Sequence, residues 1–346
     1  MINSTGFNLN KGIREKSRYG GIGIFFLTLA GLALVRIGLG FLAVPDRFVL
    51  PTNMVVGALF LGAPFISLFF AANAPWKPSL AIAFTVGGLA IQALFSVLAI
   101  SIFHGHGLGA GVCLAVAQVG LPTWCVGLGA LLATLVKEKN ILIPIAIFLA
   151  LYDASLVLTP WGPTRQIVEN APQVFTQVAA SVPRISSKSA GGNVEPGVFA
   201  GPADFVFLAM FFVAIFRFEM RAKETLYVVV PALLFYMVAV LFLGIPLPAL
   251  VPIGLAVLIV NWREFKMTRD EKLSTGLIAV LGIAILTWGA MQKRSAIEHF
   301  VPSGRQHPAQ RGPVKPVLAD PGLTSPSVPL PKAVAPSSEK LAKTPG

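Results

Sequence analysis

The chain is poor in charged residues and in cysteine. Only 12% of its 346 residues are charged, 15 of the charged residues are acidic, and two residues are cysteines. Soluble domains carry about 25% charged residues, so this composition excludes an ordinary soluble protein. Cys113 and Cys125 lie in one apolar run and form neither a disulfide pattern nor a zinc pattern. The sequence also lacks a Walker loop, a dinucleotide fingerprint and a recognisable serine and histidine arrangement.

Long apolar runs dominate the chain instead. Hydrophobic residues make up 55% of it, and its mean hydropathy is +0.76. A helix needs about 20 mostly apolar residues to cross a bilayer. The composition therefore predicts an all-α polytopic membrane protein with about nine transmembrane helices. The runs cover residues 22–44, 52–72, 79–103, 107–136, 141–160, 198–218, 226–244, 246–261 and 274–291.

These runs divide the chain into three parts. A basic segment, residues 1–21, is too long and too charged to begin a signal peptide, so we expect the first run to remain as a helix. A transmembrane domain covers residues 22–291 and includes a loop at 161–197. A tail rich in proline, serine and lysine, residues 292–346, has the composition of a disordered segment.

The fourth run, residues 107–136, is longer than one crossing requires. It fits either one tilted helix or a helix followed by a re-entrant piece, with a break at Gly120 and Pro122. Two full crossings do not fit, because a helix rises only 1.5 Å per residue.

The net charge of +12 is arranged for a membrane rather than for nucleic acid, because most basic residues flank apolar runs. Lipid is therefore the expected surrounding partner, and no nucleic acid is expected. The positive-inside rule predicts a cytoplasmic amino terminus, with the 161–197 loop on the opposite side. We expect a multi-pass protein of a bacterial-type inner or plasma membrane. The face assigned to the cytoplasm carries Lys11, Arg14, Lys16, Arg18, Lys77, Lys137, Lys139, Arg217, Arg221, Lys223, Arg263, Lys266, Arg269 and Lys272.

Two aspartates, Asp153 and Asp204, interrupt apolar runs. An aspartate near the centre of a transmembrane helix costs roughly 2.5–3.5 kcal/mol, so it usually has a function. Two carboxyl groups held close together share a proton, which is the basic requirement of an aspartic protease. Paired intramembrane acids also serve as proton relays in secondary transporters. A proton-coupled transporter is therefore an alternative, although the two halves of the chain show no repeat symmetry.

Three segments around these aspartates carry a resemblance to a known family. They are YDASLVLTPWGPTRQIVENA from Tyr152 to Ala171, GPADFVF from Gly201 to Phe207, and PAL from Pro248 to Leu250. In this order they resemble the YD, GxGD and PAL motifs of presenilins and signal peptide peptidases. The resemblance covers about residues 140–260 and implies a presenilin-like bundle. It also implies an aspartic-type endopeptidase that cuts transmembrane segments of other membrane proteins without a cofactor or a metal.

The resemblance also implies which residues act. Asp153 and Asp204 would be the catalytic pair, and Pro248, Ala249 and Leu250 would shape the site and help to hold substrate. Physical reasoning adds that Gly201 and Ala203 keep the backbone near Asp204 slim. It also places Pro202 in the first turn of a helix, so that Asp204 would lie near a helix start. Tyr152 is expected either to donate a hydrogen bond or to pack.

This chain departs from the family pattern in two respects. Ala203 replaces the second glycine of GxGD and restricts the backbone, so an inactive, presenilin-like binding protein is another alternative. Five runs precede the helix of Asp204, where the family usually has six. The local sequence is presenilin-like, but the predicted orientation is that of signal peptide peptidases. The sequence identifies no partner subunit.

Other polar residues indicate structural roles. His104 and His106 are too poorly spaced for a closed metal site and are expected in a loop. Arg36 is expected to snorkel or to pair within the bundle. Gln92 and Gln118 are expected to form hydrogen bonds between helices.

Overall fold

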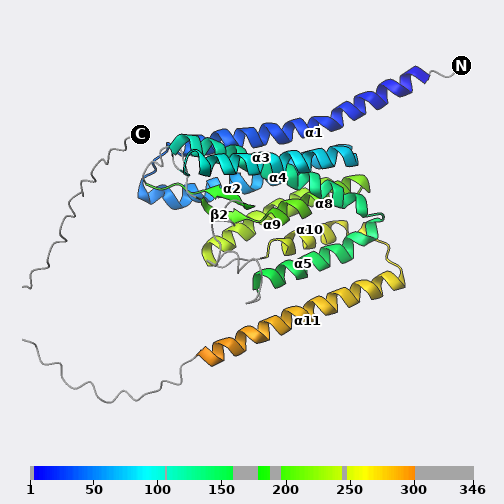
Figure 1. Cartoon of the computed structure of the whole chain (residues 1–346). Coiled ribbons are helices and arrows are strands. Elements are labelled where there is room, and N and C mark those ends of the chain that lie inside the picture. Colours follow the sequence, from blue (N-terminus) through cyan, green and yellow to red (C-terminus); the bar gives the residue numbers. More distant parts are fainter. Residues whose placement is uncertain (1–3, 106, 159–177, 188–195, 244–247, 301–346) are drawn as a thin grey trace, which may run out of the picture. The chain divides into compact units, whose positions relative to one another are not determined.

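The computed structural model describes residues 4–105, 107–158, 178–187, 196–243 and 248–300 (Figure 1). These residues form nine α-helices, two short 3-10 helices and one two-stranded sheet. The helices are α1 (Ser4–Leu39), α2 (Asp46–Ala72), α3 (Pro78–Ser101), α4 (Gly107–Leu135), α5 (Leu142–Leu158), α8 (Pro202–Arg217), α9 (Ala222–Leu243), α10 (Leu250–Asn261) and α11 (Arg269–Phe300). The 3-10 helices are η1 (Lys139–Ile141) and η2 (Trp262–Glu264), and the strands are β1 (Ala180–Pro183) and β2 (Pro196–Ala200).

Seven of the described helices are long and apolar enough to cross a membrane, namely α1, α2, α3, α4, α5 together with η1, α9 and α11. The chain is therefore a helical, multi-pass integral membrane protein, as its composition predicts. The remaining two, α8 with 16 residues and α10 with 12, are shorter than a typical crossing. They account for the difference between seven helices and the nine expected.

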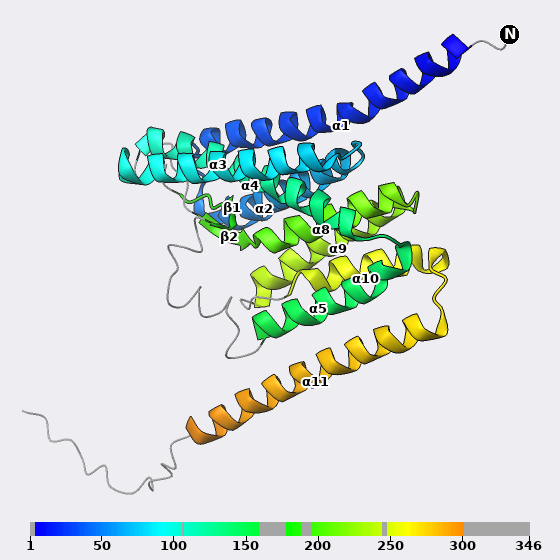
Figure 2. The same ribbon diagram turned by 45° about the vertical axis from the view of Figure 1, so that its right-hand side comes forward.

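Helices that are distant in the sequence lie side by side in the bundle. Helix α5 packs against both α10 and α11, and Figure 2 shows it between these two. Helix α10 also packs against α9, while α4 packs against α3 and α8. The helix of Asp153 thus lies next to the helix that begins with the PAL segment.

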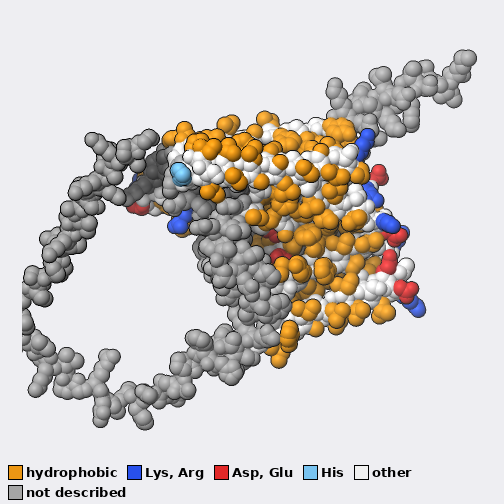
Figure 3. Space-filling view, viewed as in Figure 1, with side chains coloured by type: hydrophobic (Ala, Val, Ile, Leu, Met, Phe, Trp, Pro, Cys, Tyr) orange, Lys and Arg blue, Asp and Glu red, His pale blue; other side chains and the backbone are white. Residues whose placement is uncertain are grey.

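Charged and apolar side chains are separated along the helices of the described region. Figure 3 shows Lys, Arg, Asp and Glu side chains gathered mainly at one end, while apolar side chains cover the flank between the ends. That charged end contains the connections after α2, α4, α8 and α10 (Figure 1). A wide apolar belt bounded by charge is the arrangement that a bilayer requires.

The fourth run forms one continuous helix. Gly120 and Pro122 both lie inside α4 and do not interrupt it. Gly120 serves close packing against α3, because a Cβ added there would lie only 2.7 Å from the carbonyl oxygen of Gly88. Small residues at such contacts let transmembrane helices approach each other closely. Of the two possibilities open from the sequence, the structure therefore has the single helix.

The interior of the bundle forms around α4 and α8, which pack against each other. Ten of the 16 residues of α8 are buried, among them Phe205, Leu208, Phe211 and Phe212. Aromatic rings from α2 reach this helix: Phe65 contacts Phe205 at a centroid distance of 5.0 Å. Because α8 is enclosed by protein, most of its surface meets side chains and not lipid.

The sheet lies in and just after the segment that was expected to be a loop. Strands β1 and β2 pair antiparallel, with Ala180 opposite Ala200 and Val182 opposite Val198. Strand β1 contacts α2 and α4. The strands have four and five residues, and each carries a proline. Such short strands leave little periodicity in the sequence.

Both ends of the described region are more helical than expected. Helix α1 begins at Ser4, so the basic segment continues into the first apolar run without a break. Helix α11 extends to Phe300 instead of ending at residue 291. The rest of the tail expected to be disordered, from residue 301 onward, lies outside the described residues.

Candidate active site

Asp204 lies in the first turn of α8. Gly201 has the extended conformation of an N-cap residue, Pro202 opens the helix, and Asp204 occupies the third helical position. The Gly201 N–H donates a 3.1 Å hydrogen bond to Oδ2 of Asp204. This is the carboxylate half of a capping box, and glycine has no side chain with which to complete the other half. The prediction that Pro202 starts a helix close to Asp204 is confirmed.

The start of α8 is fixed by α4. The Cys125 thiol donates a hydrogen bond to the carbonyl oxygen of Pro202, with Sγ and O 3.5 Å apart. One turn further along α4, Gly129 lies against the backbone of α8. A Cβ added to Gly129 would lie 2.5 Å from the carbonyl oxygen of Val206. The close helix approach near Asp204 therefore comes from Gly129, whereas Ala203 is exposed.

Asp153 belongs to the last turns of α5 and is held by α10. Its Oδ2 accepts a 2.9 Å hydrogen bond from the backbone N–H of Leu250. Leu250 is the first residue of α10, where backbone N–H groups have no partner within the helix. The two helices pack closely, because a Cβ added to Gly254 would lie 3.1 Å from the carbonyl oxygen of Ala146. A residue almost 100 positions away in sequence thus orients the Asp153 carboxylate.

The PAL segment is also held by α9. Tyr236 donates a short hydrogen bond from its hydroxyl group to the carbonyl oxygen of Pro248. Pro248 and Leu250 are buried, and Ala249 is half-buried. The carbonyl oxygen of Pro248 and the N–H of Leu250 therefore both have partners inside the protein.

The two carboxylates belong to one site. Asp153 and Asp204 lie within electrostatic range of each other, and the Tyr236 hydroxyl group lies within that range of both. Both carboxylates accept a backbone N–H near the start of a helix, α8 for Asp204 and α10 for Asp153. The positive end of a helix dipole therefore faces each acid.

Two further predicted residues lie differently from the pair. Tyr152 is 49% exposed and stacks on Phe148 at 5.8 Å, which corresponds to the packing alternative. Ala203 is the second residue of α8 and has no positive φ angle. An alanine adopts that helical conformation without strain, so the missing glycine does not distort the start of α8.

Tyr236 was not identified from the sequence. It lies inside the apolar run 226–244, where a hydroxyl group is uncommon, and this position was the signal that could have indicated it. Its significance depends on α9 lying beside the start of α10, a contact that no short motif encodes.

The remaining polar residues have structural partners. Gln92 accepts a 2.6 Å hydrogen bond from the indole N–H of Trp124, which links α3 to α4 as predicted. Gln118 and Arg36 instead bind the β1 region. His104 lies in the turn after α3 with a φ of 49°, and His106 is outside the described residues. Within the described part of the chain, no group of three His, Cys, Asp or Glu side chains is arranged to hold a metal.

The chain matches no protein-family model, no curated protein and no solved structure. Interpretation of the site therefore depends on the motif residues and on their geometry.

Proposed function

We propose that this protein is an intramembrane aspartic endopeptidase, which hydrolyses peptide bonds within transmembrane segments of other membrane proteins. One observation carries the proposal. The backbone N–H of Leu250, in the PAL segment, donates to the carboxylate of Asp153, and Asp153 in turn interacts with Asp204. Three segments that resemble the motifs of one protease family thus converge on a single site.

The chemistry follows from two carboxyl groups that share one proton. The ionised carboxylate takes a proton from a water molecule while the water oxygen attacks the scissile carbonyl carbon. The protonated carboxyl group donates a hydrogen bond to the carbonyl oxygen and stabilises the charge that develops there. Collapse of the tetrahedral intermediate breaks the C–N bond, and a proton transferred to the nitrogen releases the amine.

Each carboxylate is held by one of its oxygens. Oδ2 of Asp153 accepts from Leu250, and Oδ2 of Asp204 accepts from Gly201. These bonds fix the orientation of the carboxylates before substrate arrives, which reduces the reorganisation needed during the reaction. We propose that the other oxygen of each carboxyl group, Oδ1, contacts the water molecule and the substrate.

The substrate class follows from the surroundings of the site. The two aspartates interrupt apolar runs, so the peptide bonds that reach them belong to membrane-embedded segments. A peptide bond in a helix is sheltered by the helix's own hydrogen bonds, so the substrate helix must unwind locally before it is cut. Within the single chain, Asp153 and Asp204 already lie in electrostatic range of each other.

We further propose nine membrane crossings, with α8 and α10 as the two short ones inside the bundle, and a cytoplasmic amino terminus in a bacterial-type inner or plasma membrane. Charge supports this orientation. The connections after α2, α4, α8 and α10 and the adjoining helix ends carry Lys77, Lys137, Lys139, Arg217, Arg221, Lys223, Arg263, Lys266, Arg269 and Lys272. The described residues at the opposite end carry half as many, namely Arg36, Arg47, Arg184, Lys293 and Arg294. A reporter tag inserted near residue 185 should be found on the side of the membrane opposite the cytoplasm, and a cytoplasmic location would overturn the orientation.

The decisive experiment uses the purified protein in liposomes with a reporter that contains a single transmembrane helix. We expect fragments whose masses place the cut inside the apolar segment. Asp153→Ala and Asp204→Ala should abolish cleavage, whereas Asp46→Asn, at an exposed aspartate at the start of α2, should not. If the wild-type protein and both alanine variants behave alike with several such reporters, the proposal is wrong.

A further inference from the structure

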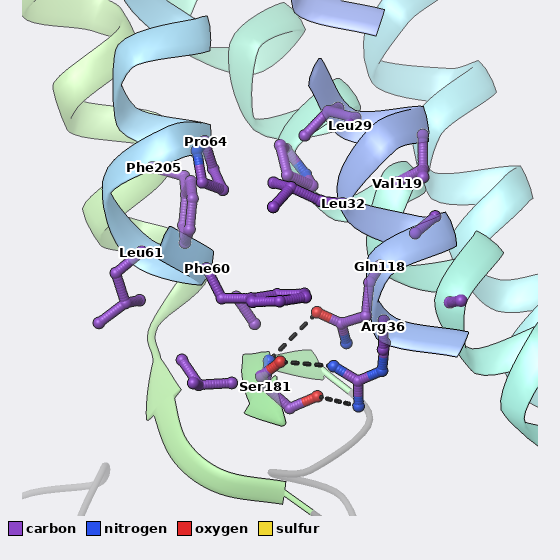
Figure 4. Close-up of a pocket in the computed structure, with 15 residues that line it drawn as sticks. Leu29, Leu32, Arg36, Phe60, Leu61, Pro64, Gln118, Val119, Ser181 and Phe205 are labelled. Atoms are coloured by element: carbon purple, nitrogen blue, oxygen red, sulfur yellow. Dashed lines mark hydrogen bonds between the residues drawn. The ribbon is translucent and has the colours of Figure 1, made fainter. Parts of the chain in front are cut away.

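A buried arginine holds the sheet that precedes the candidate active site. Arg36, near the end of α1, is only 7% exposed and lines a cavity of about 40 Å³. It donates two hydrogen bonds to Ser181 of β1, at 2.7 Å to the carbonyl oxygen and at 3.0 Å to Oγ (Figure 4). Among the described residues no carboxylate forms an ion pair with Arg36. A buried cation is costly in a membrane protein and usually has a function. The bonds of Arg36 to β1 indicate what that function is.

Two more polar side chains, from two other helices, hold the same strand and the residues on either side of it. Gln118 of α4 accepts the Ser181 N–H at 3.1 Å and donates to the carbonyl oxygen of Ala179 at 3.4 Å. Asn53 of α2 donates to the carbonyl oxygen of Ile185 at 3.0 Å and accepts the Ile185 N–H at 2.8 Å. Five of these six bonds, counting those of Arg36, are made to backbone groups of residues 179–185. The backbone of this segment is thus fixed on both sides of β1, whatever side chains the strand carries.

The fixed strand leads directly to Asp204. Strand β1 pairs with β2 from Ala180 opposite Ala200 to Pro183 opposite Pro196. Ala200 is followed immediately by Gly201, whose N–H orients the Asp204 carboxylate. A shift of β1 would therefore shift β2 and the N-cap of α8.

We propose that Arg36, Gln118 and Asn53 are positioning residues, which clamp β1 to three helices and thereby set the place of Asp204. The catalytic part of this inference depends on the proposed protease function, but the clamp itself does not. Arginine suits the position because its planar fork binds two oxygens of Ser181 at once, whereas the ammonium group of lysine is a point donor. The Arg36→Lys variant should therefore keep the clamp only in part.

The test compares Arg36→Met, Arg36→Lys and Gln118→Met with the full-length wild-type protein. Arg47→Met is the matched control, because Arg47 is exposed near the same end of the bundle and lies over the ring of Phe48. Amide hydrogen exchange is measured in peptides that cover residues 178–187 and 196–201. Charge-assisted hydrogen bonds are among the stronger ones, so exchange should rise about tenfold in Arg36→Met, less in Arg36→Lys, and not at all in Arg47→Met.

Cleavage of the transmembrane reporter provides the second readout, expressed as kcat per folded protein. We expect kcat to fall about tenfold in Arg36→Met and to recover partly in Arg36→Lys. Unchanged exchange in both Arg36→Met and Gln118→Met would overturn the clamp. Faster exchange with unchanged kcat would overturn its role in placing Asp204. If neither the wild type nor any variant cuts a reporter, the protease proposal fails, but the exchange data still show whether the clamp exists. If Arg36→Met does not fold, the Gln118→Met data test the clamp in its place.

Discussion

Replacing Tyr236 with phenylalanine removes one oxygen atom and the hydrogen bond to Pro248. The ring itself keeps its place in α9. The carbonyl oxygen of Pro248 then loses its partner in a buried segment, two residues before the Leu250 N–H that orients Asp153. We therefore expect the start of α10 to loosen and the Asp153 carboxylate to lose its fixed orientation.

The size of the effect follows from the bond that is lost. An unsatisfied buried acceptor costs about 1–3 kcal/mol. If about 1–2 kcal/mol of this cost appears in the catalytic step, kcat falls about 5- to 30-fold.

The assay is cleavage of the transmembrane reporter in liposomes, with the thermal unfolding temperature measured on the same preparations. Tyr227→Phe is the matched control, because Tyr227 lies on the same helix and is 74% exposed. We expect Tyr227→Phe to cleave at the wild-type rate. If Tyr236→Phe also does so, with an unchanged unfolding temperature, the argument that α9 supports the site through Pro248 is refuted.

Three further predictions follow from the same geometry. Gly129→Val should lower the unfolding temperature and abolish cleavage, because the valine side chain would collide with the backbone of α8. Gly87→Val should be tolerated, because a Cβ added at Gly87 has no neighbour within 4 Å. Equal effects of the two changes would refute the packing argument. Ala203→Gly should leave kcat within about twofold, because Ala203 already has a helical conformation; a large gain would show that the alanine limits activity. The rate of cleavage should pass through a maximum with pH, because the working pair holds one proton and activity is lost when both carboxyl groups are protonated or both are ionised; a rate independent of pH between acid and alkaline limits would contradict a shared proton.

The helices could be predicted from the sequence because each depends mainly on its own residues. A run of about 20 apolar residues must form a helix in lipid, where every backbone group needs an internal partner. The predicted runs at 79–103 and 107–136 correspond closely to α3 and α4. The extension of α11 to Phe300 lies beyond the apolar run, where hydropathy gives no boundary.

The sheet could not be predicted because its stability comes from elsewhere in the chain. Strand β1 has four residues, and the side chains that hold the backbone of the strand and of nearby Ile185 belong to α1, α2 and α4. Arg36 was expected to snorkel or to pair within the bundle, and it pairs; Gln118 was expected to bond to another helix, but it bonds to the β1 segment. Their common partner, Ser181, is separated from them by 145 and 63 positions, so no local pattern connects them.

The candidate site could be predicted from the sequence only in part, because some of its contacts join residues that are far apart in the chain. Pro202 locates the start of α8 from its local backbone preference alone. The link from Leu250 to Asp153 and the link from Tyr236 to Pro248 depend on how α5, α9 and α10 pack. The family motifs predicted that Asp153 and Leu250 act together, but not that a backbone N–H joins them.

The most direct test of the central claim is a double-mutant comparison at the two aspartates. Asp153→Asn, Asp204→Asn and the double variant keep the shape of the site and remove one or both ionisable groups. Residues that act as one catalytic unit give single variants as inactive as the double variant. Our account predicts equal loss of reporter cleavage in all three, with unfolding temperatures close to that of the wild type. Single variants that each retain part of the activity, with the double variant showing the product of the two losses, would contradict a shared catalytic pair.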